Sequence, residues 1–151
     1  MKHLCDSSVF LALSLGNHPH HAVAAAWMDA LAEQDGACFC RATQQSYLRL
    51  LTVSTTLKGE TRSNDEAIAA WRTLSSDPRI DLVMGEPRGL ETRWLALAGH
   101  PSAAPKRWMD AYLAAFAICA GMRFVTFDQG FEQYRKQGLD LLILGADVAP
   151  A

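Results

Sequence analysis

Three aspartates lie at the ends of predicted strands or at the start of a predicted helix that packs on the same sheet. Asp6 follows the first apolar run of the chain, Asp110 lies in the first turn of an Ala-rich helical segment, and Asp128 follows a short run of aromatic and branched residues. In a parallel sheet the strands end at one edge, and a helix that leads into such a strand begins at that same edge. We therefore expect the three carboxylates to meet there.

Three carboxylates in one cleft repel one another unless a cation lies between them. Oxygen ligands alone favour hard ions, Mg²⁺ or Mn²⁺, which usually act on phosphate oxygens. Such an ion lowers the pKa of a bound water and stabilises a leaving oxygen. An aspartate after a strand is also a common helix cap, which explains any one of the three equally well when it is taken alone.

The segment from Trp108 to Phe131 carries two of these acids. Its first half, 108–120, lacks Gly and Pro and has an apolar stripe, which predicts a helix. Gly121 is suited to end that helix in the left-handed conformation. The following residues at 124–127 predict a short strand because they are aromatic or branched.

The remaining elements alternate between strand and helix along the chain. Ser7 and Ser8 are expected to cap the second element, Thr43 to cap a helix after the second strand, and Ser63 with Glu66 to form a capping box. Strands are predicted at 1–5, 36–40, 80–84 and 139–144, helices at 9–15, 18–32, 64–74 and 90–98, a helical turn at 130–137, loops at 58–62 and 99–105, and a frayed tail from 145.

Five strands alternating with helices predict an α/β fold, with a parallel five-stranded sheet and helices on both faces. The chain has 151 residues, which suits one domain over 1–151, and half of its residues are hydrophobic, enough for a substantial core. The sequence has no internal repeat and no linker long enough to divide it.

Charge and cysteine content narrow the function. The net charge of −2 argues against a strongly basic nucleic-acid-binding coat, although a local basic rim or a metal ion can still supply a positive field. The four cysteines, Cys5, Cys38, Cys40 and Cys119, form no C-x-x-C pair and are expected to be buried apolar residues in a reducing cytoplasm. No signal-peptide core and no apolar run of membrane-spanning length are expected.

The chain resembles the PIN-domain ribonucleases, specifically the VapC-type toxins of bacterial toxin–antitoxin pairs. The matching pieces occur in the family's order and span nearly the whole chain. They are Leu4-Cys5-Asp6-Ser7-Ser8-Val9, His18-Pro19-His20-His21 with Trp27, Thr43-Gln44-Gln45-Ser46-Tyr47-Leu48-Arg49-Leu50-Leu51, Asp110-Ala111-Tyr112-Leu113-Ala114, and Thr126-Phe127-Asp128-Gln129-Gly130-Phe131.

The resemblance implies a three-layer PIN-like fold and a metal-dependent endoribonuclease that cuts RNA by water attack on a phosphodiester. It implies an antitoxin partner that blocks the site, and a toxin homodimer. Asp6, Asp110 and Asp128 would hold Mg²⁺ or Mn²⁺, and Ser7 and Thr126 would support these ligands.

One position departs from the family pattern. Family members often carry Glu directly after the Thr of the third helix, whereas this chain has Gln44. An amide oxygen can ligate Mg²⁺ or bond a metal-bound water, but it brings no charge and cannot act as a base. We expect activity to survive with three carboxylates and a weaker metal affinity. Glu86 and Glu91 are other acids in the chain, but nothing in the sequence assigns either to the site.

Several other side chains have two readings. Arg49, Lys106 and Arg107 are candidates for contacts with the RNA backbone, and solvated loop charges or structural ion pairs explain each one as well or better. Trp108 lies beside Asp110 and can stack on a base, although a packing role is the simpler expectation. The histidines at 18, 20 and 21 fit helix capping and packing better than a metal site.

Two rival functions remain open from the sequence. One is a PIN-like RNA- or protein-binding module that is catalytically weak or inactive, which Gln44 motivates. The other is a phosphate-accepting receiver domain, which is also five-stranded with an acidic pocket. A receiver needs paired acids after its first strand and a Lys after its last, whereas this chain has Asp6 alone and no Lys beyond Lys136.

Overall fold

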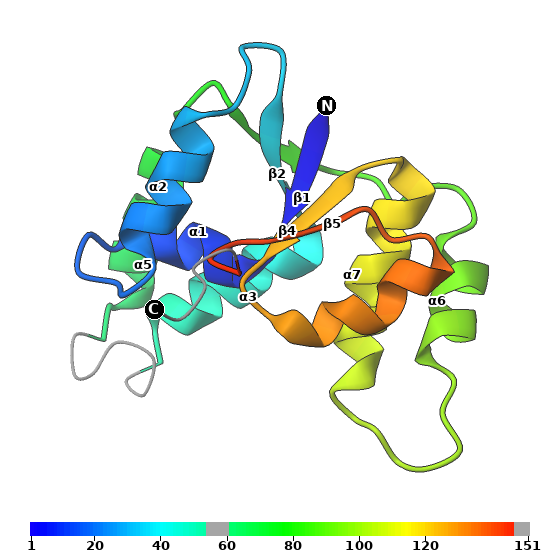
Figure 1. Ribbon diagram of the computed structural model, residues 1–151. Coiled ribbons are helices and arrows are strands. Elements are labelled where there is room, and N and C mark those ends of the chain that lie inside the picture. The colour runs from blue at the N-terminus through cyan, green and yellow to red at the C-terminus, as the bar shows by residue number, and fades with distance from the viewer. Residues whose placement is uncertain (54–60, 147–151) are drawn as a thin grey trace, which may run out of the picture.

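The computed structural model describes residues 1–53 and 61–146 and has strands and helices in alternation (Figure 1). The elements follow in the order β1 (Lys2–Cys5), α1 (Ser7–Ser14), α2 (His21–Asp29), β2 (Gly36–Cys40), α3 (Arg41–Leu51), α5 (Asn64–Ser75), β3 (Ile80–Val83), α6 (Leu90–Ala98), α7 (Arg107–Ala120), β4 (Arg123–Thr126), the 3₁₀-helix η1 (Gln129–Gln137) and β5 (Leu141–Ile143).

All five strands are parallel, in the order β3-β2-β1-β4-β5, which confirms the predicted sheet. The first strand is thus central, and β4 pairs with it in the register Leu4 to Phe124 and Cys5 to Val125. A receiver domain has the order 2-1-3-4-5, so this sheet excludes that rival.

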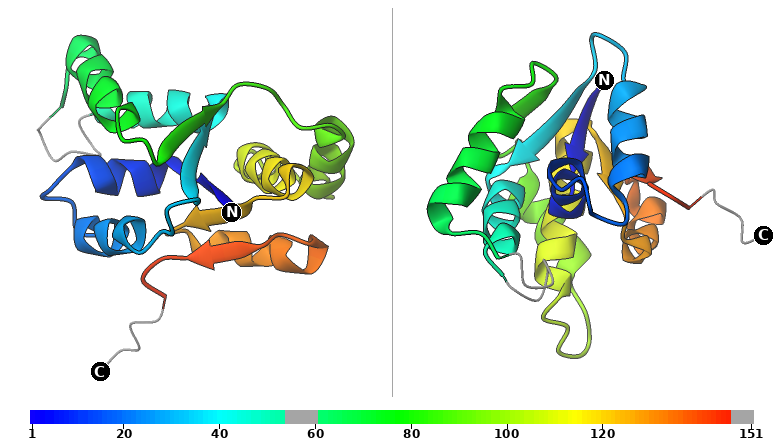
Figure 2. Two further views of the ribbon diagram at one scale, coloured as in Figure 1. Left: turned by 90° about the horizontal axis from the view of Figure 1, so that it is seen from above. Right: turned by 90° about the vertical axis from the view of Figure 1, so that its left-hand side faces the viewer.

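Successive residues of the central strands point into two separate cores, because side chains alternate across a strand. Leu4 and Phe124 belong to the core under α6, α7 and η1, while Cys5 and Val125 belong to the core under α1, α2, α3 and α5. In Figure 2 the sheet lies between α6 and α7 on one side and the N-terminal helices on the other. The predicted three layers are therefore confirmed.

Local sequence explains where most elements begin and end. The Ser63 hydroxyl accepts a bond from the Glu66 amide (3.1 Å) and the Glu66 carboxylate accepts from the Ser63 amide (3.3 Å), so the predicted capping box starts α5. Gly121 ends α7 at φ 64°, the left-handed conformation that favours glycine. Leu90–Ala98 has the predicted bounds.

One predicted cap is wrong, and another acts from inside its helix. Helix α1 begins at Ser7 itself, with Asp6 in the N-cap position, so Ser7 and Ser8 lie inside the helix. Helix α3 begins at Arg41 with Cys40 in the N-cap position. Thr43 lies in the first turn and caps the helix from there, because its hydroxyl accepts from the Cys40 amide (3.0 Å) and donates to the Cys40 carbonyl (3.1 Å). Helix α3 starts directly at the end of β2, and a single residue, Asp6, separates β1 from α1.

Other bounds differ by a few residues. Helix α2 starts at His21 because His18 and His21 form turns before it, the His18 amide bonding the Leu15 carbonyl. The last strand is limited to Leu141–Ile143, and the helical turn predicted over 130–137 is the 3₁₀-helix η1. The predicted loop at 58–62 and tail from 145 lie largely outside the described residues.

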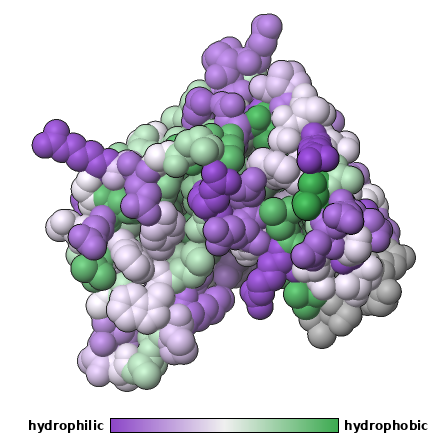
Figure 3. Space-filling view, turned by 180° about the vertical axis from the view of Figure 1, so that it is seen from behind, coloured by the Kyte–Doolittle hydropathy of each residue, from purple (hydrophilic) through white to green (hydrophobic). Residues whose placement is uncertain are grey.

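The four cysteines have the character that the sequence predicts. Cys5, Cys38 and Cys40 are buried and Cys119 is half-buried, all as free thiols. No helix of the described residues is long and apolar enough to cross a membrane. The face opposite that of Figure 1 mixes polar residues with separate apolar patches (Figure 3).

His3 is a buried base on the central strand, and neither ring nitrogen has a hydrogen-bond partner. Its ring packs edge-on against Trp27, with centroids 5.8 Å apart, and the Asp35 carboxylate lies 4.0 Å from Nε2. Burial lowers the pKa of His3 below its ordinary value of 6.5, and the attraction of Asp35 opposes this only in part.

The unfolded chain therefore binds more protons than the folded one just below pH 6.5, so stability should fall as the pH is lowered through that value. We expect His3→Phe, which keeps an apolar ring and removes the titration, to reduce this pH dependence. The His3 contribution is at most about 1.4 kcal/mol per pH unit.

Urea unfolding of both proteins between neutral and acidic pH measures the difference. His100→Gln, at an exposed position, serves as the control. His18 also has a lowered pKa, so part of the slope should remain. The same slope in wild type and His3→Phe would contradict the prediction.

Candidate active site

The three aspartates singled out in the sequence lie at the edge of the sheet where the strands end. Asp6 directly follows β1, Asp128 follows β4 by two residues, and Asp110 lies in the first turn of α7. We call Asp6, Asp110 and Asp128 the carboxylate cluster. All three are half-buried, so their oxygens remain open to a ligand.

Asp6 and Asp128 are linked by one buried hydroxyl. Thr126 Oγ1 donates to Asp6 Oδ2 (2.8 Å) and accepts from the Asp128 amide (3.0 Å). Thr126 is the last residue of β4 and is fully buried, so its rotamer is held by the core. This contact depends on β1 and β4 being neighbours in the sheet.

The helix-cap explanation fits Asp128 and fails for Asp6. The Asp128 Oδ1 atom accepts from the Gly130 amide (2.7 Å) and so caps η1. Asp6 occupies the N-cap position of α1 but makes no side-chain bond to that helix's amides. Its Oδ1 accepts instead from the Ser7 hydroxyl (3.3 Å), which also lies 3.1 Å from Ser46 Oγ. Asp6 is therefore oriented by side chains rather than by its helix.

Lys106 supplies the positive charge of the cluster. Its ammonium lies 3.2 Å from Asp128 Oδ2, and a hydrogen bond and the charge of Asp128, followed by the charges of Asp110 and Asp6, raise the pKa of Lys106. The Gly130 amide and then Lys106 lower the pKa of Asp128, against the effect of its partial burial.

Asp110 has the opposite shift. Burial raises the pKa of Asp110, and the negative charges of Asp128 and Asp6 raise it further, whereas Lys106 lowers it. The Lys106 ammonium therefore interacts electrostatically with all three carboxylates. Three acids balanced by one exposed Lys leave the cluster with an excess of negative charge, which is the condition under which a divalent cation is attracted.

The donor set fits a hard ion in its chemistry, because it offers carboxylate oxygens without sulfur or nitrogen. Within residues 1–53 and 61–146, no three acidic, His or Cys side chains are already close enough to share a metal ion. Binding would thus require the aspartate side chains to turn toward the ion and Lys106 to give way. The metal-ligand roles of the three aspartates stay a prediction.

The Gln44 side chain is buried, and its amide oxygen already has a hydrogen-bond partner. Its Oε1 atom accepts from Arg41 Nη1 (2.5 Å), and Arg41 Nη2 lies 3.5 Å from Met84 Sδ. Arg41 was not named from the sequence as a candidate site residue. Arg41 directly follows β2 and therefore stands at the edge where the strands end. The structure thus pairs the neutral residue of this position with a cation.

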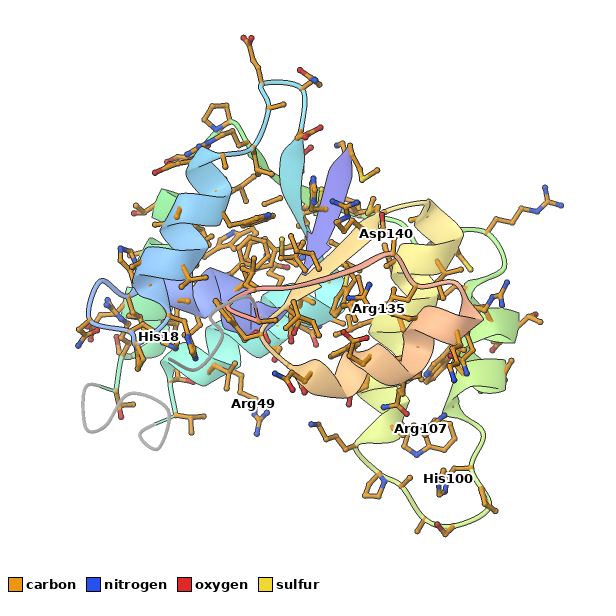
Figure 4. All side chains as sticks on the ribbon, in the orientation of Figure 1. His18, Arg49, His100, Arg107, Arg135 and Asp140 are labelled. Atoms are coloured by element: carbon orange, nitrogen blue, oxygen red, sulfur yellow. The ribbon has the colours of Figure 1, made fainter. Side chains whose placement is uncertain are left out.

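The remaining charged candidates differ in whether their side chains are bonded within the fold or exposed to solvent. Arg107 donates to the Leu97 carbonyl (3.0 Å) and to Gln133 Oε1 (2.6 Å), so it is held within the fold. Arg49 is exposed on α3, and its side chain extends away from the ribbon in Figure 4. Glu86 accepts a bond from the Tyr112 hydroxyl (2.8 Å) and Glu91 lies in the first turn of α6.

Replacing the ammonium should change the protonation of the carboxylates it serves. We expect Lys106→Met to raise the pKa of Asp128 and to raise that of Asp110 further, because both lose an attractive positive charge. Carbon-13 NMR titration of the aspartate carboxyls without added metal measures both. Lys2→Met removes a Lys paired with Asp81 at the far end of β1 and should leave both unchanged. Unaltered titration in Lys106→Met would contradict the assignment.

Comparison with known proteins gives a consistent family. Residues 4–137 match the model of the PIN domain. Two ribonucleases of Mycobacterium tuberculosis are similar in sequence. VapC41 is 48% identical over 144 residues, covering 93% of this chain and 97% of that protein, and VapC29 is 30% identical over 127 residues, covering 84% and 86%.

Solved structures share the fold at low sequence identity. VapBC2 from Rickettsia felis, solved with a promoter DNA fragment, superposes with a TM-score of 0.67 at 10% identity, covering 95% of this chain and 99% of that chain. VapC20 of M. tuberculosis, described as a toxin that cleaves the sarcin–ricin loop, gives 0.62 at 17% identity, covering 91% and 95%. The chain belongs to the PIN-domain family, among the VapC-type ribonucleases.

Proposed function

We propose that this protein is an Mg²⁺- or Mn²⁺-dependent endoribonuclease toxin that hydrolyses RNA phosphodiester bonds. The observation that carries the proposal is the carboxylate cluster, in which Asp6 and Asp128 are oriented by one buried hydroxyl and all three acids interact with the Lys106 ammonium. An oxygen-only site with excess negative charge suits a hard divalent ion.

Asp6, Asp110 and Asp128 would hold the ion, which supplies a water of lowered pKa and stabilises the leaving oxygen. Thr126 and Ser7 keep the Asp6 carboxylate oriented through their hydroxyls. The Arg41 guanidinium and the Lys106 ammonium are the cations of this edge of the sheet, suited to bind the RNA phosphates. Arg49 is a further candidate for contact with the RNA backbone.

In this proposal Gln44 orients the Arg41 guanidinium and does not bind the metal ion. Its carbonyl oxygen holds Arg41 Nη1, so its amide places a positive group where related sequences often place a negative one. Fewer charged ligands weaken the binding of a divalent ion, whereas a cation strengthens the binding of an anionic substrate.

The proposed partner is an antitoxin protein that blocks the carboxylate cluster. Support comes from relatives, since VapBC2 of Rickettsia felis and VapBC-1 of Haemophilus influenzae were solved as VapBC assemblies with folds similar to this one. We further propose that the toxin forms a homodimer. We also propose a cytoplasmic location, because free thiols are typical of a reducing compartment.

The ribonuclease assignment is tested by cleavage of RNA in Mg²⁺. We expect Asp6→Asn and Asp128→Asn each to lower the rate by at least about 100-fold, because loss of a ligand should exceed the 10- to 100-fold effect of losing its support. Addition of EDTA should abolish cleavage by the wild type. Asp81→Asn changes an exposed acid outside the cluster and should leave the rate unchanged. Full activity in both cluster variants would exclude the metal assignment.

The Thr126 hydroxyl can be tested by binding alone. We expect Thr126→Val to weaken Mn²⁺ affinity by about 10- to 100-fold, since it frees the Asp6 carboxylate, and Thr126→Ser to restore most of it. Isothermal titration calorimetry gives the affinities, and thermal unfolding reports whether each variant is folded. Equal affinities for the Val and Ser variants would contradict the role of the hydroxyl.

The rival function, a catalytically weak or inactive binding module, predicts a different titration. Gln44 favours it because the family pattern described above often has an acid at this position, whereas this chain has an amide. If the wild-type protein binds no divalent ion at millimolar concentration in the same calorimetry, the rival is supported and the ribonuclease proposal fails.

A further inference from the structure

An apolar groove with aromatic walls lies between the starts of α3 and α7, two helices that begin at the edge of the sheet where the strands end. It has a volume of about 340 Å³, at the small end of ligand pockets, and we call it the aromatic groove. Its lining residues come from the start of α3, from α6, and from the start of α7 with the residue that precedes it. They are Ala42, Trp94, Pro105, Trp108, Met109 and Tyr112.

The rings of the groove are held in place before any ligand arrives. Trp94 meets Tyr112 edge-on, with centroids 5.6 Å apart, and meets Trp108 at 6.2 Å. The Trp94 indole N–H donates to the Trp108 carbonyl (2.8 Å), and the Tyr112 hydroxyl donates to Glu86 (2.8 Å). The wall formed by Trp94 and Tyr112 is therefore preorganised.

The open side of the groove exposes apolar surface that a monomer has little reason to keep. Trp108 is 55% exposed and Met109 is 50% exposed. Both stand at the start of α7, where the sequence left Trp108 open to base stacking and favoured a packing role. A large indole left in solvent next to two fixed rings is suited to stacking on another flat group.

Several residues that line the groove are next in sequence to charged residues of the site. Pro105 precedes Lys106, whose ammonium bonds Asp128, and Ala42 follows Arg41, whose guanidinium bonds Gln44. Met109 precedes Asp110. The groove and these charged groups therefore share the starts of the same two helices, α3 and α7.

We propose that the aromatic groove is a nucleobase-binding subsite, in which Trp108 stacks on one unpaired base of the RNA that the site cleaves. The proposal rests on the proposed function, because it needs RNA to be the substrate. Aromatic rings next to cations are the pattern by which proteins bind single-stranded nucleic acids, the rings taking the bases and the cations the phosphates. Arg41 and Lys106 bring positive charge to the helix starts that form the groove, which suits an anionic RNA better than a purely apolar partner.

The test separates base binding from cleavage. A short fluorescent single-stranded RNA is titrated in EDTA, where no cleavage occurs, and anisotropy gives its affinity. We expect Trp108→Ala to weaken binding by about 5- to 150-fold, the range for one base–aromatic stack, and Trp108→Phe to weaken it less. Leu95→Ala, at an exposed position of α6 outside the groove, should bind as the wild type does.

A series of RNAs with one abasic ribose at successive positions identifies the base. At one position the wild type should lose affinity to the same extent as Trp108→Ala, and the variant should be insensitive to that change, as a double-mutant cycle requires. Equal effects of Trp108→Ala on every abasic RNA, or no measurable RNA binding by the wild type, would overturn the subsite.

Two further measurements assign a failure to its cause. If Trp108→Ala changes the oligomeric state in light scattering and no abasic position stands out, the groove is a protein interface and the subsite is wrong. Cleavage in Mg²⁺ is assayed separately. Its absence in the wild type would contradict the ribonuclease proposal, whereas cleavage without any abasic pattern would contradict the subsite alone.

Discussion

The candidate site depends on the parallel pairing of β1 with β4, which brings Asp6 and Asp128 to one edge of the sheet, where their charges raise the pKa of Asp110. Because β1 and β4 are neighbours and parallel, the acids that follow them cannot separate. The protein limits the cost with one buried hydroxyl and one ammonium. Thr126 satisfies an oxygen of Asp6 and the amide of Asp128, and Lys106 supplies the opposite charge. The remaining excess of negative charge is what makes this edge suited to a cation.

Each of these contacts depends on packing elsewhere in the molecule. Thr126 is oriented because β4 is buried between two cores, and Asp110 faces the edge because α7 must run back along the sheet to reach β4. Gly121 allows the chain to turn from α7 into that strand at a positive φ that other residues resist. The position of Asp110 is therefore sensitive to changes in α7, although Asp6 and Asp128 lie outside that helix.

Much of this was predictable from the sequence, because alternation and capping are local. The parallel sheet, the three layers and the capping box at Ser63 follow from patterns of neighbouring residues. The contact of Lys106 with Asp128 joins residues 22 positions apart, so it depends on how the helices and strands pack. The contact of Arg41 with Gln44 is an i, i+3 pair within α3, and sequence reasoning missed it because it did not consider Arg41. The starts of α1 and α3 were misplaced because at most one residue separates the strand from each helix, with no turn residues to mark the junction.

The pairing of Arg41 with Gln44 bears on the proposed activity. Replacement of an acid by an amide removes one negative charge, and Arg41 then brings a positive charge to the same place. Both changes make the local potential less negative, which disfavours a divalent cation and favours an anion such as a phosphate. A neutral residue at this position is therefore compatible with catalysis if the cations Arg41 and Lys106 offset weaker metal binding by holding the substrate. The aromatic groove beside them would contribute to the same end, because binding energy from a remote base can position the phosphate for attack.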